Sequence, residues 1–423
     1  MNNIQTITRK IQLYPIGDRE EINRVFKFIR DSQYSQYCAL NLLMGQLASL
    51  FYEYGRNLNN ESFKEIRNKK MTNSNPLLDD IEFGKGIDTK SLVTQKVKQD
   101  FSTAIKNGLA RGDRSITNYK RDTPLMTRGR DLRFIYKYEN YQDFLDELYS
   151  KDLEVFINWV NKITFKIVLG NPHKSHELRS VIKNIFEGTY KVQGSSIQFD
   201  KSGKKIILNL SMAIPKRAKE LDENTVVGVD LGVAVPAVCA LNNNKYVREY
   251  IGSSDDFLRV RTKIQAQKRR LQTSLKNSNG GHGRRKKLKP LDKFTEYEKN
   301  FVQTYNHMVS KRVVDFALKN NAKYINIENL EGYDASKYIL RNWSFYQLQQ
   351  YITYKAGLYG IEVRKINPAY TSQTCSCCGY VDSDNRPRGE KGQAYFHCLE
   401  CGEEMNADFN AARNIAMSMD FVK

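Results

Sequence analysis

Two apolar segments in the second half of the chain each end in a carboxylate, and this feature constrains the fold most. Residues 225–229 and 322–327 have the continuous apolar pattern of buried strands, and Asp230 and Glu328 follow them directly. An Asp that closes a strand is often only the polar start of a turn. Because the pattern occurs twice, we expect both acids to belong to one site.

A third acid, Asp408, lies in Asn-Ala-Asp-Phe-Asn-Ala-Ala-Arg-Asn, where we expect a helix to begin. Carboxylates on two strand ends and one helix start can converge although they are far apart in sequence. Hydrolysis of a phosphodiester needs charge stabilised on the attacking and leaving oxygens, which two Mg²⁺ ions roughly 3.5–4 Å apart provide. Mg²⁺ prefers oxygen ligands and keeps several waters, so a few carboxylates suffice. The three acids therefore predict a two-metal nuclease site.

Four cysteines between Glu328 and Asp408 have the spacing of a zinc site. They form a C-x2-C-x19-C-x2-C pattern with a glycine after each pair, and they are Cys375, Cys378, Cys398 and Cys401. Two such knuckles predict a zinc ribbon that holds one structural Zn²⁺. Cys377 leaves the register of the first knuckle open, and His397 is a less favoured substitute ligand.

Disulfide bonds are the alternative for these cysteines. The length of the chain and the absence of an apolar segment near Met1 argue against a secreted, disulfide-bonded protein. No stretch approaches 18 consecutive apolar residues, so we expect no membrane association. Cys38 and Cys239 are expected to be buried thiols. Together these features predict a cytoplasmic protein in a reducing compartment.

The charge is strongly positive, with 67 Lys and Arg against 47 Asp and Glu and a net charge of +20. Twelve basic residues and no acid lie between residues 259 and 289, in two clusters: Lys268, Arg269 and Arg270, then Arg284, Arg285, Lys286 and Lys287. Such a run is often only a solvated face. Apolar residues at 258, 264 and 271 favour an ordered basic helix instead, and we expect it to contact nucleic acid.

The order of predicted elements indicates a multidomain α+β and α/β protein. Residues 4–14 alternate like a strand, residues 20–109 have helical periodicity, and residues 163–169, 190–199 and 205–213 have strand patterns. After Asp230 we expect strands at 234–241 and 245–251, a helix around residues 302–317, the Glu328 strand, a helix from 345, and a strand at 361–366. Three strands, then alternating helices and strands, are the order of an RNase H-like fold.

Several motifs resemble the TnpB and type V CRISPR effector superfamily, and above all the miniature type V-F effectors. They are Gly-Val-Asp-Leu-Gly-Val-Ala at 228–234, Ile-Glu-Asn-Leu at 327–330, Tyr-Thr-Ser-Gln-Thr-Cys at 370–375, Asn-Ala-Asp-Phe-Asn-Ala-Ala-Arg-Asn-Ile at 406–415, Gly-Gly-His-Gly-Arg at 280–284, and Tyr-Lys-Arg-Asp-Thr-Pro-Leu at 119–125. They cover mainly the last 200 residues or so. The additional N-terminal cysteine cluster of some relatives is absent from this sequence.

The resemblance implies that Asp230, Glu328 and Asp408 form a RuvC nuclease centre that binds Mg²⁺. It also implies that Arg386 reaches the scissile phosphate, although Arg388 is an equally available guanidinium, and that Lys120 and Arg121 contact nucleic acid. The implied domains are a wedge strand (1–19), a helical recognition domain (20–114), a β-rich wedge domain (115–217), a RuvC domain (218–370, with a basic helix at 257–289), a zinc-ribbon insertion that binds target nucleic acid (371–404), and the C-terminal part of RuvC (405–423).

By the same resemblance the partners are a guide RNA and target double-stranded DNA beside a T-rich flanking motif. Two copies would share one guide RNA as an asymmetric homodimer, and one RuvC site would cut both DNA strands. Base pairing would then select the sequence while the protein reads backbone shape. A TnpB nuclease that uses a transposon-derived RNA and a guide-dependent repressor that does not cut are the alternatives.

Overall fold

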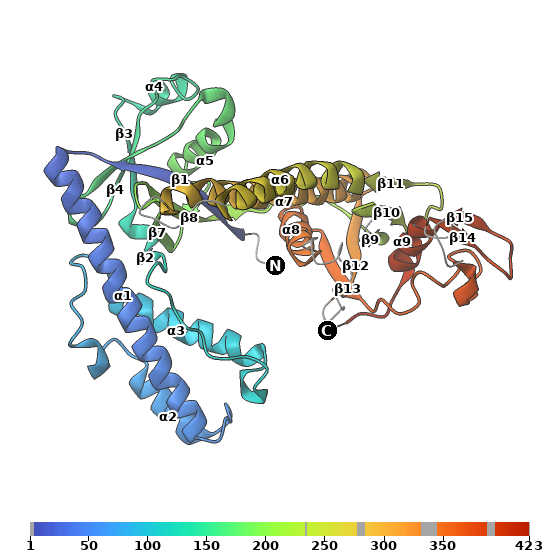
Figure 1. The fold of residues 1–423 in the computed structure, drawn as a ribbon, viewed down its shortest axis with the longest axis horizontal. Helices are drawn as coiled ribbons and strands as arrows, with labels where there is room; N and C mark the ends of the chain where they lie inside the picture. Colours follow the sequence, from blue (N-terminus) through green and yellow to red (C-terminus); the bar gives the residue numbers. More distant parts are fainter. Residues whose placement is uncertain (1–3, 233–234, 277–283, 331–344, 387–393, 423) are drawn as a thin grey trace. The chain divides into compact units, whose positions relative to one another are not determined.

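The chain divides into two compact units, Met1–Pro215 and Lys216–Lys423 (Figure 1). The computed structural model describes residues 4–232, 235–276, 284–330, 345–386 and 394–422, with the backbone alone at 275–276 and 284–288. The boundary after Pro215 lies close to residue 218, the predicted start of the nuclease domain. The finer division into named domains stays a prediction.

The first unit contains an eight-stranded sheet with the order β2-β7-β8-β1-β5-β4-β3, and β6 pairs with β8 beside this path. Its long central pair joins β1 to β8 in antiparallel register from Ile4↔Pro215 to Leu13↔Ile206. The strands are β1 (Ile4–Pro15), β2 (Leu125–Thr127), β3 (Arg133–Tyr136), β4 (Val155–Asn158), β5 (Thr164–Ile167), β6 (Lys191–Val192), β7 (Ser195–Phe199) and β8 (Ile206–Pro215). The strand predicted at 4–14 is confirmed by β1.

The helical segment predicted at 20–109 is confirmed, and it consists of α1 (Arg19–Glu53), α2 (Glu61–Lys70) and α3 (Thr89–Lys106). Asp18 and Glu21 form a capping box at the start of α1, because each side chain accepts the backbone N–H of the other residue, at 2.8 and 3.0 Å. The three helices share one apolar core, which includes Leu43, Phe51, Phe63, Val97 and Phe101.

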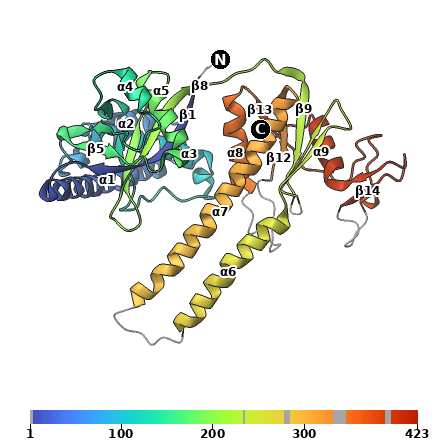
Figure 2. The same ribbon diagram turned by 90° about the horizontal axis from the view of Figure 1, so that it is seen from above.

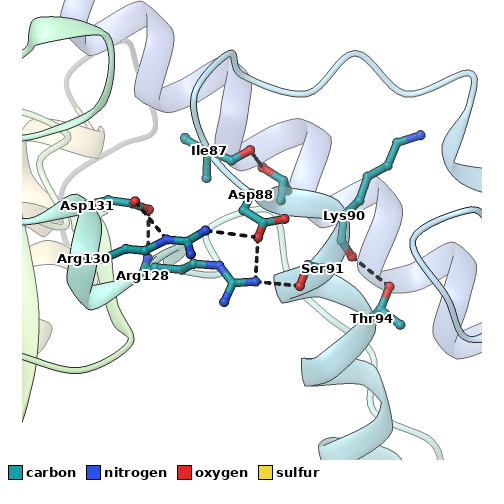
Figure 3. Close-up of polar contacts among 9 residues, drawn as sticks. Ile87, Asp88, Lys90, Ser91, Thr94, Arg128, Arg130 and Asp131 are labelled. Carbon is teal, nitrogen blue, oxygen red and sulfur yellow. Dashed lines mark hydrogen bonds and ion pairs between the residues drawn. The ribbon is translucent and has the colours of Figure 1, made fainter.

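An ion-pair cluster attaches α3 to the segment that follows β2 (Figure 3). The Arg128 guanidinium lies between Asp88 and Ser91, with its Nη2 2.6 Å from both the Asp88 carboxylate and the Ser91 hydroxyl. Arg130 Nη2 lies 3.8 Å from the same carboxylate and remains largely exposed. Asp131 accepts the backbone N–H of Arg128 at 3.3 Å. The Arg128 contacts hold the start of α3 against this segment.

The first unit differs from the sequence-based expectation at several points. The single strand expected at 190–199 is interrupted, because β6 and β7 both pair with β8 but with one extra residue between Val192↔Met212 and Ser196↔Asn209. The Ser195 hydroxyl accepts the backbone N–H of Ser211 at 3.0 Å and so stabilises this bulge. The strands β2, β3 and β4 and two helices of this part, α4 (Tyr141–Asp146) and α5 (His176–Phe186), were not predicted from the sequence.

The second unit is built on a five-stranded sheet with the order β11-β10-β9-β12-β13. β12 is parallel to both β9 and β13, whereas β10 is antiparallel to β9 and to β11. The strands are β9 (Asp222–Asp230), β10 (Ala237–Leu241), β11 (Arg248–Ile251), β12 (Ala322–Glu328) and β13 (Glu362–Ile366). They occur in the predicted chain order, and the strand predicted at 234–241 begins at Ala237.

Helices cover both faces of this sheet. On one face, α7 (Arg284–Lys319) and α8 (Phe345–Leu358) pack against Val227, Val229, Ile325 and Ile327 of the central strands. On the other face, α9 (Ala407–Met417) places Phe409 and Ala412 against Val238 and Ala240 of β10. Burial of an apolar side chain of this size stabilises the fold by roughly 1.5–3 kcal/mol each. The two apolar faces explain why the strands have no polar alternation.

The basic stretch at 257–289 was predicted as one helix but lies on two, α6 (Ser254–Lys276) and α7. Figure 2 shows α6 and α7 side by side, and Arg261 of α6 pairs with Glu298 of α7 at 2.8 Å. Residues 277–283, with the Gly-Gly-His-Gly motif, lie outside the described residues. Among the described residues, no helix has both the length and the apolar character needed to cross a membrane.

Candidate nuclease site and metal-binding cluster

The structure brings Asp230, Glu328 and Asp408 together at one end of the five-stranded sheet. Asp230 and Glu328 are the last residues of the parallel neighbours β9 and β12, in which Val229 pairs with Ile327. The two acids are therefore adjacent at the same edge of the sheet. Asp408 lies in the first turn of α9, after the N-cap residue Asn406.

The three acids interact electrostatically. Burial raises the pKa of Asp230 well above its usual range, and the charges of Glu328 and Asp408 raise it further, while Arg386 opposes them. Burial also raises the pKa values of Glu328 and Asp408. Buried carboxylates whose charges act on one another favour a bound cation, since like charges without a counter-ion are unfavourable. Their oxygen atoms are the ligand type that Mg²⁺ takes.

Two side chains on the segment after β13 contact these acids. The Thr371 hydroxyl donates to Glu328 Oε1 at 2.6 Å and thereby lowers the pKa of that carboxyl, against the larger effect of burial. Arg386 Nη2 lies 3.6 Å from Asp408 Oδ1. The arginine predicted for the site is therefore next to the acids, whereas Arg388 lies outside the described residues. Thr371 was not predicted as a site residue.

Close packing of α9 on the sheet sets the position of Asp408. A Cβ atom on Gly228 would overlap the carbonyl oxygen of Ala412 and the backbone nitrogen of Ala416, so only glycine permits this approach. The buried Asn326 amide of β12 donates to the Ile415 carbonyl at 3.0 Å at the end of the same helix. These two residues hold α9 against β9 and β12.

The four predicted zinc ligands form one cluster, in which all the Sγ atoms lie within 4.8 Å of one another. The Sγ atoms of Cys375 and Cys401 are 3.7 Å apart, and those of Cys378 and Cys398 are 3.5 Å apart. Tetrahedral zinc with Zn–S bonds of about 2.3 Å would separate its sulfur atoms by about 3.8 Å. The donor set and its spacing therefore fit a structural zinc ion.

The geometry of the knuckles shows which cysteines of the first knuckle belong to the cluster, a choice that the sequence left open. Cys377 is exposed, does not belong to the cluster, and donates its backbone N–H to Cys375 Sγ at 3.4 Å. Gly379 has φ +81°, which is the left-handed conformation that glycine adopts without strain. His397 is not part of the cluster, and its Nδ1 lies 3.4 Å from Glu404.

The two cysteines outside the ribbon differ in burial. Cys239 is fully buried on β10, and burial raises its thiol pKa. The prediction of a buried thiol is confirmed for Cys239. It is wrong for Cys38, which is only partly buried on α1.

Buried asparagines attach the cysteine cluster to α9. Asn410 of α9 accepts the backbone N–H of Ser376 at 2.9 Å and donates to the Thr374 carbonyl at 2.8 Å. Asn385 accepts the backbone N–H of Leu399 at 3.0 Å and so joins the two halves of the ribbon. Because Asn410 lies two residues after Asp408, the cluster and the acids share one helix. The only sequence signal for these roles was the motif at 406–415, which contains Asn410.

Most of the predicted nucleic-acid contacts that the structure describes are exposed. Lys120 and Arg121 lie at a surface turn, where Arg121 stacks on Tyr34 with 4.7 Å to the ring centroid. Arg269 and Arg270 on α6 are exposed and Lys268 is half-buried. The side chains of Arg284, Arg285, Lys286 and Lys287 lie outside the described residues, although their backbone begins α7. The binding roles of all nine residues stay predictions.

Comparisons with known proteins found relatives of this chain. The family model described as "Cas12f1-like, TNB domain" matches residues 345–415, which include the cysteine cluster and most of α9. A CRISPR-associated endodeoxyribonuclease Cas12f1 from Sulfoacidibacillus thermotolerans is 36% identical over 77% of this chain and 76% of its own length. The putative RNA-guided DNA endonuclease InsQ of Escherichia coli is 28% identical over 45% of this chain and 48% of its own length.

The fold of the chain is also that of a solved relative. A Cas12f1 chain from a cryo-EM structure with sgRNA and target DNA matches with a TM-score of 0.68 and 21% identity, over 98% of this chain and 99% of that one. The coverage of the Sulfoacidibacillus relative is broad enough to establish family membership. This chain therefore belongs to the Cas12f1 family of CRISPR-associated endodeoxyribonucleases.

Proposed function

We propose that this protein is a CRISPR-associated RNA-guided DNA endonuclease whose nuclease centre consists of Asp230, Glu328 and Asp408. The observation that carries the proposal is the convergence of these three carboxylates at one sheet edge, with a raised pKa for each. Perturbed carboxylates that face one another are common at catalytic sites. The named activity of the relatives supports the same assignment.

The donor set fits Mg²⁺ because it offers hard oxygen ligands that repel one another in the absence of a cation. Asp230, Glu328 and Asp408 would hold the ions. When bound, two Mg²⁺ ions would stabilise charge on the attacking and leaving oxygens of the phosphodiester. Thr371 orients the Glu328 carboxylate by donating to its Oε1. Arg386, which lies 3.6 Å from Asp408, would bind the scissile phosphate.

The protonation of the acids predicts how cleavage depends on pH. A carboxyl group with a raised pKa keeps its proton at a higher pH than usual, and the protonated form is a poor metal ligand. Cleavage is therefore expected to increase as pH rises through the raised pKa values of Asp230, Glu328 and Asp408.

The remaining parts of the proposal concern partners and domains. We assign guide RNA and target double-stranded DNA as partners, because solved relatives were determined with sgRNA and target DNA and because the chain carries a net charge of +20. The first unit would hold recognition and wedge domains, and residues 218–370 and 405–423 would form the RuvC domain around the ribbon at 371–404. We further propose that two copies form an asymmetric homodimer, that the protein recognises a T-rich flanking motif, and that it cuts both DNA strands.

The experiment uses purified protein with its co-purified RNA, a matched plasmid library and Mg²⁺. Asp230→Ala is expected to reduce cleavage by about 10³-fold or more, which corresponds to about 4 kcal/mol of transition-state stabilisation. Guide-directed DNA binding should persist, because Asp230 is a proposed metal ligand and not a proposed DNA contact. The control Asp222→Asn removes a carboxylate at the opposite, exposed end of the same strand and should cut normally. Normal cutting by Asp230→Ala would refute the assignment.

Sequencing of the bound RNA tests the alternative that relatives such as InsQ raise. A repeat-spacer RNA is expected for a CRISPR effector. An RNA from a transposon end would instead indicate a TnpB-type nuclease. Bound guide and matched DNA without any Mg²⁺-dependent cleavage would indicate a repressor.

A further inference from the structure

Arg248 and Tyr250 lie on β11, the edge strand of the five-stranded sheet, and face the side of the sheet that α9 covers. The alternating residues of β11 face the opposite side: Ile251 is buried in the core with α7, and Glu249 accepts hydrogen bonds from Arg312 of α7 at 2.6 and 3.0 Å. Successive side chains of a strand point to opposite faces. Arg248 and Tyr250 therefore share a face with α9.

The register of the sheet aligns these two residues with the carboxylate site. Tyr250 pairs with Val238, and Val238 pairs with Asp230 on β9. Paired residues of antiparallel strands project from the same face. Tyr250 thus belongs to the same cross-strand row as Asp230, two strands away, which corresponds to about 10 Å between the backbones. Arg248 lies in the next row, which continues through Ala240 to Gly228 under α9.

Both side chains also approach the start of α9. The Arg248 guanidinium lies over the Phe409 ring, 4.8 Å from its centroid, and Phe409 follows Asp408 directly. Tyr250 is 39% exposed although it lies in this row. Burial raises the pKa of Tyr250, the charge of Arg248 lowers it, and the charge of Asp408 raises it. The phenol therefore lies within the electric field of the carboxylate site.

We propose that Tyr250 and Arg248 form a DNA-positioning lip beside the carboxylate site, where the tyrosine ring stacks on a base and the guanidinium contacts a backbone phosphate. This inference rests on the proposed nuclease function. The bound strand is single-stranded DNA, whose unpaired bases an aromatic ring can reach. The contacted base lies within a nucleotide or two of the scissile phosphate, given the distance between the rows. Stacking is insensitive to base identity, because every base has an aromatic face.

The two residues are positioning residues, because they touch the flanking nucleotide and not the reacting atoms. Loss of one base–aromatic stack typically costs 1–3 kcal/mol, which corresponds to about 5- to 150-fold in affinity for the strand. A purely structural role of Arg248 predicts a different result when it is substituted. Arg248 could serve only to cover Phe409, and its loss would then lower stability without any dependence on the DNA.

The test measures single-turnover cleavage of a target whose displaced strand is already unpaired near the cut. Tyr250→Ala is expected to raise the DNA concentration for half-maximal rate by about 5- to 150-fold and to leave guide-directed target binding unchanged. Tyr250→Phe should behave like wild type, because the ring is kept. Tyr246→Ala is the matched control, since Tyr246 is a 78% exposed tyrosine in the turn before the same strand.

An abasic position in the DNA distinguishes stacking from a structural effect. Single abasic sites are placed in turn at each of several nucleotides on either side of the cut. At one of these positions the wild type and Tyr250→Ala should need the same DNA concentration for half-maximal rate, because the base that stacks is gone. Arg248→Ala should weaken strand binding and reduce its dependence on salt, as expected for one lost phosphate contact.

The outcomes separate this inference from the proposed function. If wild type cuts and Asp230→Ala does not, the nuclease assignment holds whatever the lip variants do. If Tyr250→Ala then cuts with wild-type concentration dependence, or if no abasic position removes its defect, the lip is refuted. If wild type does not cut at all, the proposed function fails and this inference fails with it.

Discussion

The cysteine cluster and the carboxylate site lie in the same unit and share α9, but they are assembled in different ways. The cluster is made by two knuckles, each of which places two cysteines through a local turn, and its four sulfur atoms lie within 4.8 Å of one another. The carboxylate site needs two strands and a helix whose acids are 178 residues apart at the extremes, Asp230 and Asp408. One site is local in sequence, and the other depends on the fold.

The two sites also differ in what stabilises them. Backbone N–H groups donate to sulfur in both knuckles, from Cys377 to Cys375 and from Cys401 to Cys398, each at 3.4 Å. Burial raises the pKa of the Cys375 thiol to about 12, and these bonds oppose burial by favouring the thiolate. Burial raises the pKa of all three acids, and at Asp230 the charges of Glu328 and Asp408 raise it further. The cluster is thus held by bonds within its own knuckles, whereas the carboxylate site gathers buried acids whose charges oppose one another at Asp230.

Cys398→Ser should have the largest effect, because a structural zinc site contributes apparent binding free energy of about 10–16 kcal/mol in small zinc domains. Zinc content should fall from one per chain to near zero, and cleavage should decrease more than guide-RNA binding. Metal analysis of the purified protein measures this. The control Cys377→Ser removes the exposed cysteine outside the cluster and should retain zinc. Full zinc content in Cys398→Ser would mean that the ligand set is wrong.

Gly228→Ala should break the carboxylate site while sparing the cysteine cluster. The added methyl would overlap the backbone of α9 at Ala412 and Ala416, and such overpacking costs about 3 kcal/mol. Cleavage should be lost because Asp408 moves away from Asp230, yet zinc should remain at one per chain. Gly194→Ala, at a glycine with open space around it, is the control and should cut normally. Loss of zinc together with cleavage would show that the two sites are not independent.

Thr371→Val should slow cleavage by about 10- to 100-fold, since a hydrogen bond to a charged group contributes about 1.5–3 kcal/mol. The lost bond would raise the pKa of Glu328 further, because the Thr371 hydroxyl lowers it in the wild type. The acidic side of the pH–rate profile should therefore move to higher pH. Thr371→Ser keeps the hydroxyl and should restore both rate and profile. An unchanged profile in the valine variant would exclude Thr371 as a positioning residue.

Asp230→Asn should have the smallest effect of these substitutions. We expect it to stabilise the protein against thermal unfolding in the absence of metal. A carboxyl group whose pKa is raised on folding stabilises the protein below its unfolded pKa, and this contribution is lost as pH rises through the folded pKa. At neutral pH the neutral amide should therefore raise the Tm by about 2–4 °C, the shift that about 1 kcal/mol produces in a unit of this size.

Thermal unfolding without added Mg²⁺ or chelator, which leaves the cysteine cluster intact, measures this gain. The gain should disappear at a pH of about 3, where the unfolded carboxyl group is itself protonated. Added Mg²⁺ should reverse the order, because the variant lacks a metal ligand and gains less from binding. A lower Tm for Asp230→Asn without added Mg²⁺ would contradict the raised pKa of Asp230.

The sequence patterns predicted the strands and the helix that carry the two sites. They did not predict the side-chain hydrogen bonds that support these elements. The apolar runs before Asp230 and Glu328 identified β9 and β12, because residues buried on both faces leave a continuous apolar signature. Thr371, Asn326 and Asn410 were missed, because a single polar residue has no periodicity. Their partners lie 43, 89 and 34 residues away. The bulge between Val192 and Ser196 was missed for the same reason, since it depends on β8.

The sequence by itself identified the two cysteine knuckles and the strands that end in acids, and the structure then excluded Cys377 and His397 from the cluster. Knuckle spacing and buried strands are local properties, and the covalent chain enforces them over a few residues. Only the tertiary structure decided that Asp408 meets Asp230, that Arg386 reaches Asp408, and that Tyr250 shares a row with Asp230. The physical reason is that these contacts join segments far apart in the chain. Sheet register and the close approach of α9 at Gly228 bring them together, and each of these depends on many side chains at once.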